Sequence, residues 1–365
     1  MQLDFFPSRT LTVYLAKLFI VRIIAMLAVL VLVLMMLDLL SNSGKILAVE
    51  GNGQAQLWTY VTLRIPQLVA RFMPYAVLLA TLISLVTLNQ NSEVVAMKAA
   101  GLSAHQVLAP LLLTAGVVSI LSFGFNERIV TRANATLSAW QSNDFGPVPG
   151  DSGVRTNVYL TDGVNILTAN TITGSGFTMK MTGVTWYQRD ANHMLSQQIR
   201  ADQADYAAPG WKMADATRFN VQKADTDKIG SITIGQEITP AQIELQTINP
   251  EGQNILELSR SIADYEAAGR RTSELRGRWW HKIAGPLAAF LMPLLGAVAA
   301  FGLARSGQLF IRALIGMGLG FAYFVVDNAA LAMGNFGGYP PLLAAWGPFL
   351  LFLLIGETVL VRTEE

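Results

Sequence analysis

Long apolar segments separated by short polar stretches occupy both ends of this chain. A helix needs about 20 apolar residues to cross the hydrocarbon core of a bilayer. The pattern therefore predicts six membrane-spanning helices, three before and three after a more polar middle. Their expected ranges are Thr10 to Leu40, Leu57 to Leu88, Ala104 to Phe125, Trp279 to Leu303, Leu309 to Met333 and Leu342 to Val361.

The polar middle of the chain has a different periodicity. Between Val154 and Leu245, apolar residues alternate with polar ones in short runs, which is the pattern of half-buried strands. Turn signals such as Asp162-Gly163 and Pro209-Gly210 separate the runs. The pattern predicts an all-β domain of antiparallel strands, a sandwich or jellyroll-like fold, followed by a polar helix from Ser259 to Arg276.

Aromatic side chains in this middle segment have two interpretations. They are Trp186, Tyr187, Tyr206, Trp211 and Phe219. Aromatic residues in strands usually pack in the core. The alternative is that one face of the sheet lines an acyl chain.

The distribution of charge supports this division. Hydrophobic residues make up 52% of the 365 residues and charged residues only 14%, well below the roughly 25% of soluble domains. Of the 51 charged residues, 30 lie between Arg128 and Gly277. We therefore assign residues 1–127 to the first three spans, 128–277 to the β domain and its helical linker, and 278–365 to the last three spans.

Positive residues predict the orientation of the spans. Arg9, Lys17 and Arg22 lie at the start of the first span, Arg305 lies between the fourth and fifth spans, and Arg312 lies at the start of the fifth. Loops rich in Lys and Arg remain in the cytoplasm. We expect both termini in the cytoplasm and the β domain on the opposite, outer side of the membrane.

A polar connector, Asn89 to Gly101, separates the second and third spans. Its residues fit a short amphipathic helix with Ser92 as N-cap and Gly101 at the end. The residues proposed to present this helix to a partner are Glu93, Val94, Met97, Lys98 and Gly101. The alternative is a solvated turn whose charges simply face water.

Two arginines lie in the second span, close to its prolines Pro66 and Pro74. Arg64 and Arg71 are seven residues apart, so they share one face of a helix. They could attract an anionic lipid head group. Alternatively, their side chains extend to the membrane interface without a ligand.

Two carboxylates lie inside predicted spans. Asp38 falls near the far end of the first span, where water is close, and Asp327 lies in the fifth span. A charged residue inside a membrane is a functional candidate, although a polar partner on a neighbouring helix explains Asp327 equally well. In the fifth span, Gly316, Gly318 and Gly320 favour close helix packing.

Several kinds of chemistry have no signature in the chain. There is no Gly-x-x-x-x-Gly-Lys-Ser/Thr loop for nucleotide phosphates, no cysteine, and no hydrolase motif. The three histidines, His105, His193 and His281, are too scattered for one metal site. A net charge of +1 gives no reason to expect nucleic acid. We expect a non-catalytic subunit without cofactor or metal, and any ATPase must be another subunit.

Local motifs along the whole chain resemble one family. They are Ile65-Pro66 and Phe72-Met73-Pro74, the segment from Asn91 to Ser103, the segment from Trp280 to Pro286, Val326-Asp327-Asn328, and Gly338-Tyr339-Pro340-Pro341. Together with the order of spans and β domain, they resemble the LptF/LptG (YjgP/YjgQ) family of lipopolysaccharide export permeases, and its G-type members more closely.

This resemblance implies a half-transporter of the bacterial inner membrane with a periplasmic jellyroll. It implies an ABC transporter whose partners are an LptF-like second permease, an LptB-like ATPase dimer and an LptC-like jellyroll protein, with lipopolysaccharide as cargo. Glu93 falls on the carboxylate of the coupling helix of the family. The resemblance therefore favours a docking role for the connector.

One departure from the family concerns the head group. Family members carry lysines near the outer end of the first span, where this chain has Met35, Ser41 and Asn42. The nearest cation is Lys45. The candidates for head-group binding are therefore Lys45, Arg64 and Arg71.

Two other classes of function remain as alternatives. A secondary transporter would depend on Asp327 and need no ATPase, although the spans lack the series of acidic residues and histidines of a proton relay. A membrane-anchored periplasmic lipid chaperone would keep the β domain without depending on Glu93.

Overall fold

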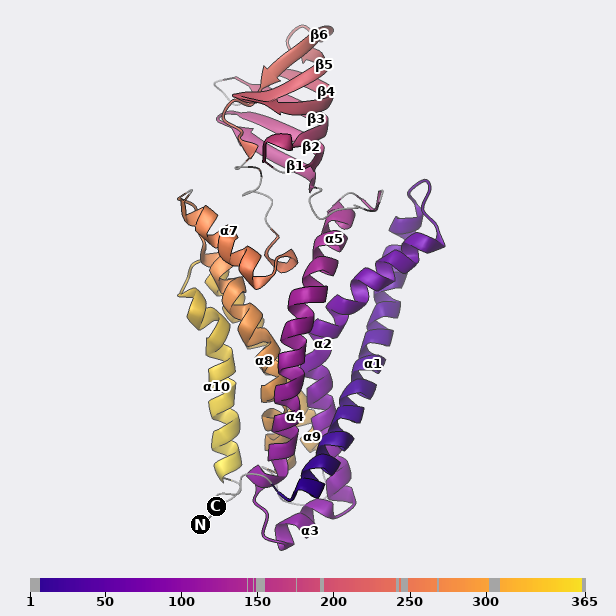
Figure 1. Cartoon of the computed structure of the whole chain (residues 1–365), viewed down its shortest axis with the longest axis vertical. Coiled ribbons are helices and arrows are strands. Elements are labelled where there is room, and N and C mark those ends of the chain that lie inside the picture. The colour runs from indigo at the N-terminus through magenta and orange to yellow at the C-terminus, as the bar shows by residue number, and fades with distance from the viewer. Residues whose placement is uncertain are drawn as a thin grey trace. The chain divides into compact units, whose positions relative to one another are not determined.

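The computed structural model describes residues 7–142, 144–146, 148, 155–174, 176–190, 194–240, 243, 249–267, 269–301 and 309–362. The chain divides into two compact units. One unit comprises residues 1–41, 61–131 and 253–365 and holds most of the long helices. The other comprises residues 42–60 and 132–252 and holds the β sheet (Figure 1).

The long helices are α1 (Arg9–Leu47), α2 (Gln54–Gln90), α4 (Ala104–Phe125), α8 (Ser273–Phe301), α9 (Leu309–Asn335) and α10 (Pro341–Arg362). Shorter helices are α3 (Glu93–Ala99), α5 (Thr131–Ser142) and α7 (Ile255–Ala267), and a π-helical turn, η1 (Asn126–Val130), joins α4 to α5. Within the described residues, six helices are long and apolar enough to cross a membrane. The six predicted spans are therefore confirmed within these residues, whereas the predicted end of the fourth span at Leu303, and Arg305 after it, lie outside the described residues.

The helices extend beyond the apolar runs that predicted them. Helix α1 continues to Leu47 through Ser41, Asn42 and Lys45, and α2 begins at Gln54. Backbone hydrogen bonds do not require apolar side chains, so a helix continues after hydropathy has fallen. Pro66 and Pro74 lie inside α2, which is one continuous helix in the structure.

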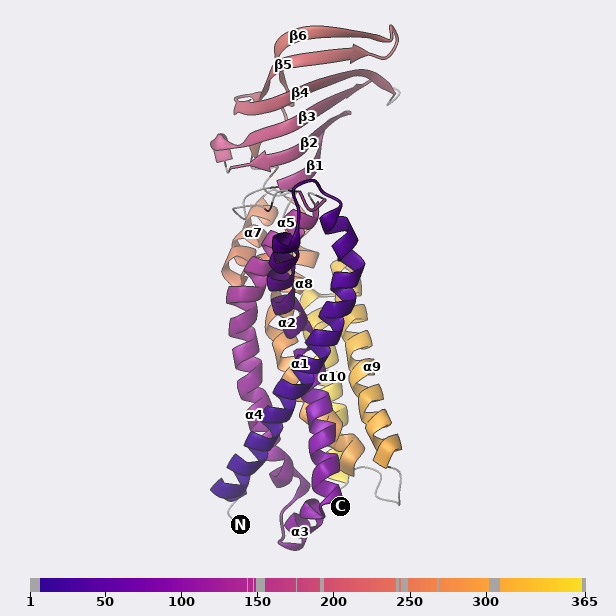
Figure 2. The same ribbon diagram turned by 90° about the vertical axis from the view of Figure 1, so that its right-hand side faces the viewer.

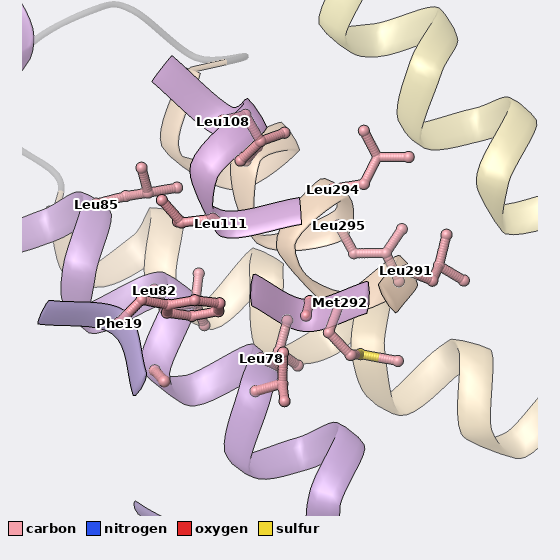
Figure 3. Packing of buried hydrophobic residues seen from close by; sticks show 14 of the residues in the cluster. Phe19, Leu78, Leu82, Leu85, Leu108, Leu111, Leu291, Met292, Leu294 and Leu295 are labelled. Carbon is pink, nitrogen blue, oxygen red and sulfur yellow. The ribbon is translucent and has the colours of Figure 1, made fainter. Parts of the chain in front are cut away.

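Helix α8 is at the centre of the helical unit. It packs against α4, α7, α9 and α10. The core includes side chains from four helices, seen in Figure 3: Phe19 of α1; Leu78, Leu82 and Leu85 of α2; Leu108 and Leu111 of α4; and Leu291, Met292, Leu294 and Leu295 of α8. Each side chain is nearly inaccessible, so these helices form one continuous core.

Helix α1 exposes a large apolar surface. Leu32 is 70% exposed, Met36 is 77% exposed and Leu40 is 79% exposed. Soluble proteins rarely leave such a contiguous apolar face in water. The exposure fits a helix whose outer face is covered by lipid or by another membrane helix.

The six strands form one antiparallel sheet in chain order. They are β1 (Arg155–Asp162), β2 (Asn165–Thr173), β3 (Lys180–Arg189), β4 (Leu195–Ala207), β5 (Gly210–Asn220) and β6 (Asp225–Ile234). Asp162-Gly163 lies where β1 turns into β2, and Pro209-Gly210 lies where β4 turns into β5, as these signals predicted. The all-β domain is confirmed, and its described strands form a single meander (Figure 2).

One face of this sheet carries the second hydrophobic core. Trp186 is 6% exposed and Trp211 is fully buried, and both belong to this core. The indole nitrogen of Trp211 donates a hydrogen bond to the carbonyl oxygen of Ile238 at 2.8 Å. Phe177 is 82% exposed and Phe219 is 38% exposed. The two tryptophans are therefore core residues, whereas these two phenylalanines are not.

Candidate functional site

Helix α3 forms the connector between α2 and α4, at the same end of the bundle as the start of α1 and the end of α10 (Figures 1 and 2). Val94 and Met97 are buried in the core of the helical unit, with exposures of 4% and 8%. Val95 is 63% exposed, and Lys98 is exposed. The predicted amphipathic helix is therefore present, anchored by two apolar side chains.

The C-terminus of α3 has the hydrogen bonds of a Schellman motif. The amide of Gly101 donates to the carbonyl of Lys98 at 3.0 Å, and the amide of Leu102 donates to that of Met97 at 3.1 Å. Gly101 has a φ of 86°, which a residue with a Cβ adopts only with strain. Gly101 therefore ends α3 as predicted.

The predicted N-cap is wrong. Ser92 has a φ of 58°, and its side chain makes no capping hydrogen bond. N-cap residues use an extended backbone that directs the side-chain oxygen to the free amides of the first turn. The left-handed backbone of Ser92 lacks that conformation. The Glu93 carboxylate in the first turn favours the helix through the helix dipole.

A second cap begins the next helix. Ser103 accepts a hydrogen bond from the amide of Gln106 at 3.1 Å, and Gln106 accepts one from the amide of Ser103 at 3.0 Å. This capping box fixes the start of α4 at Ala104, three residues after Gly101. The Ser-x-x-Gln spacing is its sequence signal. Helix α3 is thus connected to α4 through a short segment with defined hydrogen bonds.

The Glu93 carboxylate has a partner on helix α1. The hydroxyl group of Tyr14 donates to Oε2 of Glu93 at 3.2 Å, and Nδ2 of Asn91 donates to Oε1 at 3.3 Å. Sequence reasoning missed Tyr14, which is 79 positions from Glu93. No local pattern marks a contact over that separation.

Asp38 and Arg64, predicted as separate candidates, form an ion pair. Nε and Nη2 of Arg64 lie 3.1 Å and 3.0 Å from the two carboxylate oxygens of Asp38. Nη1 of Arg64 also donates to Oε1 of Gln67 at 2.7 Å. The side chains of Arg64 and Asp38 are only 27% and 19% exposed. A bidentate pair of this kind is strong and directional, so it joins α1 to α2.

The other two head-group candidates are exposed. Arg71 lies one turn before Pro74 in α2, and within the described part of the chain it makes no hydrogen bond or ion pair. Lys45 lies in the last turn of α1. Arg64 and Arg71 therefore differ, because only Arg64 has its charge neutralised by a neighbour.

Asp327 in α9 also has a partner. Its Oδ2 lies 3.0 Å from Nε2 of His281 in α8, and Asp327 as a whole is 8% exposed. The polar partner that the sequence left open is therefore a histidine on a neighbouring helix. Among the described residues, no three His, Asp or Glu side chains are grouped to hold a metal ion.

These features define a class of protein: a multi-pass helical membrane protein with an inserted β domain and a short polar helix between its second and third spans. The chain belongs to the family described as lipopolysaccharide export system permease LptF/LptG, whose model matches residues 13–362.

Two curated relatives have the same printed name, lipopolysaccharide export system permease protein LptG. The protein from Escherichia coli strain K12 is 24% identical over 310 residues, which cover 83% of this chain and 84% of the relative. The protein from Haemophilus influenzae is 25% identical over 324 residues, which cover 86% of this chain and 89% of the relative. The similarity therefore includes both the spans and the β domain.

Proposed function

We propose that this chain is the G-type permease subunit of an ATP-driven transporter that extracts lipopolysaccharide from the bacterial inner membrane. Its β domain lies in the periplasm and passes the lipid toward a protein bridge to the outer membrane. The observation that carries the proposal is the family match over residues 13–362, which includes helix α3.

The partners follow from what this chain lacks. The sequence has no P-loop, so ATP hydrolysis requires a separate ATPase, for which an LptB-like dimer is the candidate. An LptF-like permease would complete the membrane cavity, and an LptC-like jellyroll protein would receive the lipid from the β domain. The large exposed apolar face of α1 supports a second membrane protein beside it.

Helix α3 is the proposed docking element for the ATPase. Val94 and Met97 hold it in the core of the helical unit, while Glu93, Val95 and Lys98 remain partly or fully accessible. Because the short turn at Gly101 and the capping box join α3 to α4, a push on α3 would be transmitted to a membrane-spanning helix. This is a way to convert nucleotide-driven closure of an ATPase dimer into movement of the permease.

A charge reversal at Glu93 tests the proposal. We expect Glu93→Lys to insert in the membrane and co-purify with the second permease, but to lose the ATPase and ATP-dependent release of lipopolysaccharide from proteoliposomes. The control is Glu50→Lys, the same charge change at an exposed residue of the α1–α2 loop. If Glu93→Lys couples ATP hydrolysis to lipid release as well as the control does, the docking role is wrong.

The same assay separates the alternatives. A secondary transporter would export lipid without an ATPase or ATP. It would lose activity in Asp327→Asn, because the partly buried Asp327–His281 pair would carry the proton. A lipid chaperone would retain activity in Glu93→Lys. The proposed permease requires ATP and Glu93.

A further inference from the structure

A buried ion pair joins η1, the turn that follows α4, to α8. Nζ of Lys282 lies 3.1 Å from Oε1 of Glu127, and the two side chains are 9% and 12% exposed. Removing two charges from water is costly unless each is well paired and its remaining hydrogen-bonding capacity is used. The second oxygen of Glu127 therefore needs a hydrogen-bond donor of its own.

That second oxygen binds the start of helix α7. The backbone amide of Ile255 donates to Oε2 of Glu127 at 2.6 Å. Oδ1 of Asn254 accepts from the next two amides, of Leu256 and Glu257, at 3.0 Å and 2.9 Å. Free amides at a helix N-terminus favour a negative charge. Glu127 therefore holds α7 through its backbone as well as pairing with Lys282.

Helix α7 is also attached to α8 along its length. Leu258 is fully buried, and the indole nitrogen of Trp279 donates to the hydroxyl oxygen of Ser259 at 2.8 Å. In chain order, α7 follows the last strand and precedes α8. It is therefore the segment through which the chain returns from the β domain to the membrane helices.

The position of Glu127 depends on a π-helical turn. Glu127 is the second residue of η1, which follows α4 without a break. A π-helical turn is rare, and it is frequently found at functional sites. Helix α4 has 22 residues, so it is about 33 Å long. Helix α4 begins inside the capping box that follows α3, and its last residue adjoins η1.

We propose that Glu127 is a junction that transmits movement of α3 and α4 to α7, the helix that precedes α8. Glu127 and Lys282 are positioning residues in this scheme, since they act through α7 and not on the lipid. This inference rests on the proposed ATP-driven function. It adds that α7 follows the movement of α4 through one carboxylate.

A charge swap separates the two contacts of Glu127. In the double variant Glu127→Lys, Lys282→Glu, the pair between η1 and α8 is kept with its charges exchanged, but residue 127 can no longer accept from the Ile255 amide. The second variant, Glu127→Gln with Lys282→Met, removes both charges and keeps a neutral acceptor at 127. A variant that fails to fold is thereby distinguished from one that fails to transmit.

The structural readout is the distance between α4 and α7. The chain contains no cysteine, so spin labels can be placed at Leu113→Cys in α4 and Leu256→Cys in α7, both exposed positions. In the assembled complex with the ATPase, we expect a narrow distance distribution that is unchanged by nucleotide, because α4 and α7 move together. In the swap variant we expect a broad distribution that changes with nucleotide.

The functional readout is export per ATP hydrolysed in the complete complex. We expect the swap variant to hydrolyse ATP at close to the wild-type rate but to export lipopolysaccharide about tenfold less per ATP, the factor for losing one charged hydrogen bond. The neutral double variant should fall between wild type and swap.

Two results would overturn the junction. The first is a swap variant that exports lipid as well as the wild type and keeps its narrow, unchanged distance distribution. The second is a wild-type complex in which the α4–α7 distance changes with nucleotide. A wild-type complex without ATP-dependent export would instead overturn the proposed function.

Discussion

The hydroxyl group of Tyr14 in α1 donates a hydrogen bond to the carboxylate of Glu93 in α3, at 3.2 Å from Oε2. The proposed docking residue is therefore already held by a helix other than its own. Helix α1 also exposes a large apolar face. A partner that binds the Glu93 carboxylate must displace the Tyr14 hydroxyl group or share the carboxylate with it. Docking at α3 and the position of α1 are therefore linked.

Replacing Tyr14 by Phe tests this link. The variant loses only the hydroxyl group, so we expect the complex to assemble, with a loss of stability below about 1.5 kcal/mol. ATP-dependent lipid release should fall severalfold. Tyr159→Phe, at another exposed tyrosine, should have no effect. In a double-mutant cycle with Glu93→Gln, the effects should be non-additive because the two residues are in contact. Additive effects would show that the hydrogen bond is not used.

The membrane spans could be predicted from sequence because their signal is local. Each span is a predominantly apolar run, and alternation identified the β domain. Gly101 was also predictable, since a glycine after a short helical pattern is a common stop signal. Ser92 was mispredicted as an N-cap, because the backbone conformation that a cap requires is not visible in the residue type.

The pairs between helices could not be predicted. Arg64 with Asp38, and His281 with Asp327, are separated by 26 and 46 positions. Which faces of two helices meet depends on packing of the whole bundle, and no periodicity specifies it. Sequence reasoning therefore identified Arg64, Asp38 and Asp327 individually but not as members of pairs.

Gly101 is expected to tolerate Asn better than Val. A Cβ at this position would meet no atom within 4 Å, so the cost comes only from its φ of 86°. Asn adopts the left-handed region more readily than a β-branched residue. We expect Gly101→Val to destabilise the end of α3 by about 1 to 2 kcal/mol. Hydrogen exchange of the Leu102 amide should rise in Gly101→Val and change little in Gly101→Asn. Equal exchange in the two variants would contradict the assignment.

Gly334 lies at a close approach between α9 and α10. A Cβ there would be 2.4 Å from Cβ of Ala344, which cannot rotate away. The two helices must therefore separate in Gly334→Ala, at a cost of about 1 to 3 kcal/mol. Gly318→Ala in the same helix is the control, because a Cβ at that position meets nothing within 4 Å. Thermal unfolding of the purified chain in detergent should show a lower midpoint for Gly334→Ala alone, and equal midpoints would contradict this contact.

The stability of the β domain should depend on pH because two carboxyl groups, those of Asp162 and Glu237, are neighbours. Burial, and then the neighbouring Glu237 carboxyl, raise the pKa of Asp162 above its usual value. A raised pKa means that the folded domain favours the protonated acid, so this contribution to stability is present below about pH 4 and is lost as the pH rises through the folded-state pKa.

The variant Asp162→Asn should therefore stabilise the sheet near neutral pH. We expect slower hydrogen exchange in β1 and β2 at pH 7.5, with a gain below about 1 kcal/mol because the pair is largely solvated. The difference from wild type should disappear near pH 4. Asp190→Asn, in the turn after β3, is the control. A gain that is largest at low pH would have the wrong sign for this explanation.

Arg71 should contribute more than Arg64 to binding of an anionic head group. Both arginines lie in α2, but the Arg64 guanidinium is paired with Asp38 in bidentate geometry, whereas Arg71 is exposed. We expect Arg71→Gln to weaken binding of lipopolysaccharide in nanodiscs by about tenfold at low salt, and Arg64→Gln to weaken it much less. Lys45→Gln measures the contribution of the third candidate.

Asp38→Asn gives the complementary test. Removing the carboxylate leaves the Arg64 guanidinium without its ionic partner, so its charge becomes available to a phosphate. Lipid affinity should rise, while the stability of the chain falls by about 1 to 3 kcal/mol because a partly buried charge has lost its partner. The explanation is wrong if Asp38→Asn leaves lipid affinity unchanged and Arg64→Gln lowers it as much as Arg71→Gln does. In that case Asp38 does not prevent Arg64 from binding the lipid.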